Sequence, residues 1–97
     1  MDAQVLEILR GIDDPELGVN LVDLGLVYAA SRDPQRIAVQ MTATSRSCPL
    51  GEYLREEARA RLARAFPEKD LLDVELVWAP AWSPSRMTSA GRAELGL

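Results

Sequence analysis

The stretch that decides the fold of this chain reads Ile37-Ala-Val-Gln-Met-Thr-Ala-Thr-Ser-Arg-Ser-Cys-Pro49. Its first part, residues 37–44, predicts a strand, because side chains of a strand alternate between two faces. One face is apolar and the other carries Thr42 and Thr44. Pro49 suits the first position of a helix, and an amphipathic run continues from it to residue 66. The stretch therefore predicts a strand that leads through a short loop into a helix.

The only cysteine of the chain, Cys48, stands at this predicted junction beside the cation of Arg46. Backbone N–H groups and the helix dipole favour negative charge at a helix N-terminus, where the pKa of cysteine thiols tends to be lowered. We therefore expect Cys48 to be a functional thiolate, with the two threonines leading to it on one polar face. The alternative is a small buried apolar side chain, which is the commoner use of a lone cysteine.

The rest of the chain supplies further elements around this unit. The patterns predict a helix over 3–10, a turn over 13–18, a buried strand over 24–30, a strand over 73–78 and a final helical turn within 87–95. We predict one α+β domain over residues 1–97, of order α-β-β-α-β with that last turn, whose helices pack on one face of a small mixed sheet.

The strand–helix–strand unit should be a parallel crossover, and a sheet of three strands leaves an open face and open edges. These open surfaces favour partner binding or a homodimer. Trp82, in the irregular tail, is expected to pack over the edge of the core rather than to bind a ligand.

Composition excludes several functions. The net charge is −4 over 97 residues, which argues against a nucleic-acid partner. The chain has no histidine, so it can form no catalytic triad and no histidine-based metal site. One cysteine cannot complete a four-thiolate cluster site. No apolar run is long enough to span a membrane and no signal peptide opens the chain, so we expect a cytoplasmic protein.

Four segments together resemble a known family. They are Asp14-Pro-Glu16, the stretch from Val19 to Tyr28, Met41-Thr-Ala-Thr44 with Cys48-Pro49, and Val77-Trp-Ala-Pro-Ala-Trp82. In order and spacing they are similar to the small metal–sulfur cluster assembly family. That family includes SufT-type iron–sulfur maturation factors and PaaD-type proteins of aerobic phenylacetate degradation. The resemblance implies an α/β fold related to iron–sulfur scaffold and carrier domains.

The resemblance also implies one small polar site. Its members would be Asp14, Glu16, Asp23, Thr42, Thr44 and Cys48. Structural alternatives stay open for most of them. Asp14 could stabilise its own turn before the proline, Asp23 could cap a helical turn, and the threonines could shape the loop that presents the cysteine.

Three functions remain open. The first is an assembly or maturation factor in which the Cys48 thiolate transiently holds iron or an iron–sulfur cluster, shared across a homodimer or with a client or assembly protein. The second is an adaptor that binds no metal, including a PaaD-type accessory of a phenylacetyl-CoA oxygenase. PaaD-type proteins look longer, with a cysteine-bearing extension, and this chain stops at Leu97. The third, a thiol enzyme, would have only carboxylates as its base.

Overall fold

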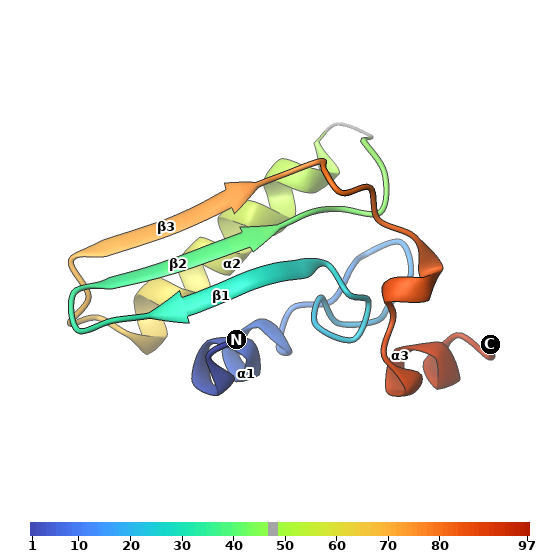
Figure 1. The fold of residues 1–97 in the computed structure, drawn as a ribbon, viewed down its shortest axis with the longest axis horizontal. Helices are drawn as coiled ribbons and strands as arrows, with labels where there is room; N and C mark the ends of the chain where they lie inside the picture. The colour runs from blue at the N-terminus through green and yellow to red at the C-terminus, as the bar shows by residue number, and fades with distance from the viewer. Residues whose placement is uncertain (47–48) are drawn as a thin grey trace.

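The computed structural model describes residues 1–46 and 49–97 (Figure 1). Ser47 and Cys48 lie outside the described residues. The elements are α1 (Ala3–Leu9), β1 (Val27–Arg32), β2 (Arg36–Met41), α2 (Leu50–Ala65), β3 (Leu71–Leu76), a 3₁₀ turn η1 (Pro84–Arg86) and α3 (Ser89–Glu94). Among these residues, no helix is long and apolar enough to cross a membrane.

The sheet has three strands in the order β1-β2-β3. β1 and β2 form an antiparallel pair, whereas β2 and β3 are parallel with Val39 opposite Val74. α2 connects the two parallel strands, as Figure 1 shows. The predicted α+β class, the mixed sheet and the parallel strand–helix–strand unit are therefore confirmed.

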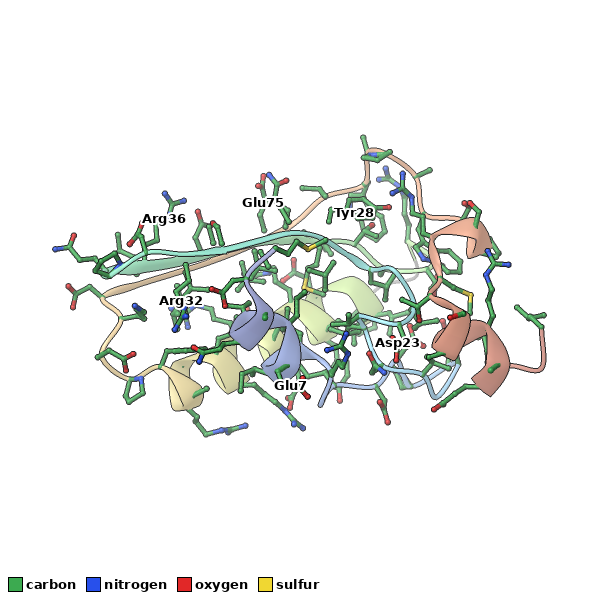
Figure 2. The ribbon with its side chains drawn as sticks, turned by 60° about the horizontal axis from the view of Figure 1, so that its bottom comes forward. Glu7, Asp23, Tyr28, Arg32, Arg36 and Glu75 are labelled. Atoms are coloured by element: carbon green, nitrogen blue, oxygen red, sulfur yellow. The ribbon has the colours of Figure 1, made fainter. Side chains whose placement is uncertain are left out.

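The core lies between the sheet and two helices. α1 and α2 lie against the same face of the sheet and contact each other (Figure 2). The alternation predicted for the central strand is confirmed at Ile37, Val39 and Met41, which are at most 1% exposed. α3 does not cover this face. It lies beyond the strand ends and packs on the loop at Asp23, whose backbone oxygen would be 2.5 Å from a Cβ placed on Gly91.

The N-terminus secures the free side of β1. Asp2 caps α1 by accepting the Val5 N–H at 2.9 Å, and this bond is the main cause that lowers the pKa of the Asp2 carboxyl. The Asp2 N–H donates in turn to the Ala30 carbonyl oxygen at 2.9 Å. Its carboxylate also pairs with Arg32 at 3.2 Å. One residue thus starts the first helix and occupies the outer edge of β1.

The central strand is shorter than the sequence predicts. β2 ends at Met41, so Thr42 and Thr44 follow the strand rather than belong to it. The Thr42 N–H donates to the carbonyl oxygen of Leu26 at 2.8 Å. Leu26 immediately precedes Val27, the first residue of β1 and the one paired with Met41. Thr42 is 1% exposed, so it does not lie on a polar strand face as the sequence predicts. Alternation ends where the regular strand ladder ends.

Boundaries also differ at the first strand. The sequence predicts a strand over 24–30 and a polar connection after it, whereas β1 begins at Val27 and continues to Arg32. The residues before Val27 instead form turns, which a backbone φ of +78° at Gly25 permits. Polar residues at the end of β1 extend the strand because they pair with β2, with Arg32 opposite Ile37.

The tail crosses the end of the sheet and is fastened to these turns. The indole N–H of Trp82 donates to the Leu24 carbonyl oxygen at 2.7 Å, and the Thr88 N–H donates to the Asp23 carbonyl oxygen at 2.9 Å. The Tyr28 hydroxyl donates to the Pro80 carbonyl oxygen at 2.9 Å. Trp82 is half-buried against the core, as predicted.

Two glycines test this docking of the tail. A Cβ on Gly25 would overlap the backbone of Arg86, whereas Gly18, with φ of +72°, has open space around it. We expect Gly18→Ala to lower the free energy of unfolding by about 1 kcal/mol from backbone strain. Gly25→Ala should lower it by about 2–5 kcal/mol, because overlap adds to strain. Urea unfolding followed by circular dichroism measures both. Equal losses would mean that the tail does not pack on Gly25.

Candidate functional site

A cavity lies where the chain leaves the two parallel strands. Parallel strands have their carboxyl ends at the same edge of a sheet, which is where ligands bind in many α/β proteins. Here the cavity has a volume of about 220 Å³. Its lining comes from the segments after β2 and β3: Thr42, Ala43, Thr44, Ser45, Arg46, Trp78, Ala81 and Trp82.

The two predicted threonines share this cavity. Thr42 is buried and held by its backbone bond to Leu26, and Thr44 is half-buried. Their hydroxyl groups are the kind of side chain that can both donate and accept hydrogen bonds. The structure therefore brings together Thr42 and Thr44, as predicted, but in a loop rather than on one face of a strand.

The indole of Trp78 contacts residues on both sides of the segment 47–48. The Arg46 guanidinium carbon lies 4.8 Å from the centre of the Trp78 ring. Gly51, in the first turn of α2, packs on the same indole, since a Cβ on Gly51 would be 3.4 Å from two of its ring atoms. Trp78 thus contacts a residue on each side of residues 47–48, and it holds a cation at the rim of the cavity.

Asp14 is completely buried in the predicted turn. Its Oδ1 accepts the backbone N–H of Glu16 at 2.7 Å and that of Leu17 at 3.0 Å. These bonds make it a turn-stabilising residue, the structural alternative left open by the sequence. Its Oδ2 is also buried, and it has no hydrogen-bond partner among residues 1–46 and 49–97. A buried carboxylate oxygen without a partner is unfavourable and calls for an explanation such as a ligand or an ion.

Asp23 fastens the tail. Its Oδ2 accepts the side-chain amide of Asn20 at 2.8 Å, and its Oδ1 accepts the Thr88 hydroxyl at 2.9 Å. The Asp23 N–H donates to the Asn20 side-chain oxygen at 2.9 Å. Figure 2 shows Asp23 beside the last turns of the chain. Glu16, the third predicted acid, is exposed.

The predicted site is therefore divided in the part of the chain that the structure describes. The threonines line the cavity, whereas Asp14, Glu16 and Asp23 do not. No hydrogen bond between described residues joins these acids to the threonines. Within the same residues, no group of three acidic or cysteine side chains is placed to hold a metal ion. Cys48, the predicted thiolate, lies outside the described residues.

The sequence did not predict Trp78 and Ser45 as members of the cavity, and Trp82 was expected to pack over the core edge rather than to bind a ligand. A signal for Trp78 was available. It stands at the end of the third predicted strand, and parallel pairing with residues 37–44 places the two strand ends together. The Arg46–Trp78 contact had no such signal.

These features define a small α+β domain with a polar cavity at the carboxyl ends of two parallel strands. The chain belongs to the iron-sulfur cluster assembly protein family, whose model matches residues 2–75. This confirms the family predicted from the sequence.

Curated relatives and a solved structure agree with this assignment. The chain is 38% identical over 85 residues to the Fe-S protein maturation auxiliary factor SufT of Staphylococcus aureus (strain USA300), which covers 87% of this chain and 96% of that protein. It is 36% identical over 94 residues to the Fe-S protein maturation auxiliary factor YitW of Bacillus subtilis (strain 168). This alignment covers 96% of this chain and 91% of YitW. A crystal structure of a domain of unknown function from Bacillus anthracis matches with a TM-score of 0.88 and 35% identity, covering 97% of this chain and 90% of that chain.

Two substitutions separate the roles of the two Asp14 oxygens. Asp14→Asn keeps an oxygen that can accept the Glu16 and Leu17 N–H groups, so we expect the free energy of unfolding to change by less than about 1 kcal/mol. Asp14→Ala removes both bonds and should lower it by about 1–3 kcal/mol. Urea unfolding of both variants checks this. Equal losses would show that the amide group introduced in place of Oδ2 costs as much as the loss of both turn bonds.

Proposed function

We propose that this protein acts in the maturation of iron–sulfur proteins and carries iron or a small iron–sulfur cluster as cargo, with the Cys48 thiolate as the ligand from this chain. Its family and the names of its relatives as maturation auxiliary factors support the maturation role. Thiolates are soft ligands that suit iron–sulfur clusters. We infer a cytoplasmic location, where thiols stay reduced.

One observation carries the proposal. Cys48 is separated by a single residue from Arg46, which lines the cavity, and by one residue from Leu50, where α2 begins. The only cysteine therefore belongs to the segment that connects the cavity to a helix N-terminus. Hydroxyl groups and a cation are the partners that stabilise a negatively charged group. We assign this role to Thr42, Thr44 and Arg46.

The acids receive different roles under this proposal. Asp14 does not line the cavity, and we keep it as a proposed site residue only because its buried Oδ2 lacks a partner among the described residues. Asp14 Oδ2 would bind iron while it is loaded, or it would help to position the loop after β2. Asp23 instead holds the tail, since Asn20 and Thr88 already engage both of its oxygens. Glu16 remains a predicted site residue without a structural argument.

A single thiolate leaves most of the coordination of iron open. The remaining ligands would come from a second copy of the chain, a client or an assembly protein. An open site favours transfer of cargo over storage, because the receiving protein can supply ligands before the donor releases its own. We therefore propose transient carriage, and we regard catalysis by the thiol as the weaker alternative, since the chain has no histidine to act as base.

Anaerobic reconstitution with iron and sulfide tests carriage. If a two-iron cluster is shared between two copies, the wild type should retain on the order of one iron per chain after desalting. Cys48→Ser should retain at least about tenfold less, which corresponds to about 1.4 kcal/mol or more of lost binding free energy. Asp14→Asn should lose iron to a smaller extent. Iron content and visible absorption measure the result.

A matched control guards against damage to the fold. Asp23→Asn changes an acid that we assign to the tail, so its iron content per folded chain should equal that of the wild type. Equal iron in wild type and Cys48→Ser would contradict carriage by Cys48. If neither protein retains iron, this chain would act in maturation as an adaptor that binds no metal, the alternative to which the PaaD-type hypothesis belongs.

A further inference from the structure

The outer edge of β3 presents unpaired backbone groups. In the ladder with β2, the Leu71 N–H donates to the Gln35 carbonyl oxygen at 3.1 Å and the Val77 N–H donates to that of Met41 at 2.8 Å. Residues of a parallel strand direct their backbone groups alternately to its two sides. The N–H and C=O groups of Leu72, Val74 and Leu76 therefore point away from β2. In Figure 1, no other strand of the described residues lies beside this edge, and the first turn of α2 projects past β3 near its end.

The two edges of the sheet differ in this respect. On β1, the outward carbonyl oxygen of Ala30 accepts the Asp2 N–H, and Tyr28 bonds to the tail. Among the described residues, no hydrogen bond outside the sheet ladder involves the backbone groups of Leu72, Val74 or Leu76. An uncovered edge strand is a template for another strand, and proteins usually protect such an edge unless it is used.

The side chains along β3 differ between its two faces. On the helix face, Leu72 and Leu76 are only half-buried, whereas Val39 of the central strand is 1% exposed. On the open face, Asp73 and Glu75 are exposed. Asp73 pairs with Arg36 at 2.7 Å, but Glu75 accepts only from the neutral amide of Gln40 at 3.1 Å. A further strand would cover the leucines and meet the acids.

Charge argues against a second copy of the chain in this position. In an antiparallel pair of identical strands, the residue on the two-fold axis faces itself. An axis at Asp73 places this acid against itself, and an axis at Val74 places Asp73 against Glu75. These two registers pair most of the strand, and like charges directly opposite each other are destabilising. The preceding segment, residues 68–70, contains two acidic residues and one lysine, so the edge is acidic overall.

We propose that the β3 edge docks an extended segment of a partner protein, with basic side chains at alternate positions over the open face and apolar side chains between them over the helix face. This is recognition by strand addition, in which backbone bonds give affinity and alternate side chains give specificity. Trp78, which lines the cavity, is separated from the end of β3 by one residue, so the docked segment lies next to the candidate site. The proposal does not depend on metal carriage by Cys48.

Hydrogen exchange of backbone amides, read by NMR on the full chain, tests the proposal. The probe is an eight-residue peptide of alternating lysine and valine, acetylated and amidated at its ends. At a peptide concentration ten times the measured Kd, we expect the Leu72, Val74 and Leu76 amides to exchange about tenfold more slowly. Asp73→Asn with Glu75→Gln should weaken binding about threefold to tenfold, since each cross-strand charge pair contributes a fraction of a kcal/mol.

A backbone variant tests the geometry. The Leu72 N–H points outward, so Leu72→Pro removes an edge donor without removing a bond to β2. We expect it to abolish protection of the Val74 and Leu76 amides by the peptide, while Leu72→Val, which keeps the N–H group, retains it. Exchange of the β2 amides shows whether the proline variant is folded. If it is not, the charge variant and the control peptide still decide.

Two results would overturn the proposal. The first is equal protection by a peptide of the same composition with lysines and valines in separate blocks, which would indicate nonspecific attraction to an acidic protein. The second is protection of the three amides in the free protein that grows with its own concentration, which would make a second copy the occupant of the edge.

Discussion

The parallel pairing of β2 with β3 is the constraint on which the rest of the molecule depends. It requires a long connection, and α2 provides it while burying one face of the sheet. It also places both strand ends at one edge, so that residues 42–46 and the tail after β3 meet there. An antiparallel β3 would have sent Trp78 to the opposite end of the sheet and left no cavity.

A second set of contacts keeps the tail at this edge. The turns before β1 receive it through the Trp82 indole, the Thr88 backbone and the close packing of Gly25 on Arg86. Because the Thr42 N–H bonds to the Leu26 carbonyl oxygen, the same turns also fix the start of the loop that leads toward Cys48. The segments that follow β2 and β3, together with the turns before β1, thus determine where the cavity lies.

Much of this architecture could be predicted from the sequence, because it follows from local patterns. The buried face of β2, the amphipathic α2 and the parallel crossover are of this kind. Contacts between distant residues were less accessible. Asp23 was placed in the functional site by resemblance, but its carboxylate bonds to Thr88, 65 residues away. Thr42 was placed on a polar strand face because the pattern of alternation does not show where the ladder ends.

Trp78 lies beside both proposed surfaces, the cavity and the outer edge of β3. It lies two residues after the end of β3, and its indole contacts Arg46 on one side of residues 47–48 and Gly51 on the other. Leu76, whose outward backbone groups belong to the open edge, would also be 2.9 Å from a Cβ on Gly51. A strand added at this edge would restrict the last residues of β3, whose Leu76 side chain packs on Gly51 in the first turn of α2. Under the two proposals, partner docking at β3 and the residues around the cavity would be linked through the packing of Leu76 and Trp78 on Gly51.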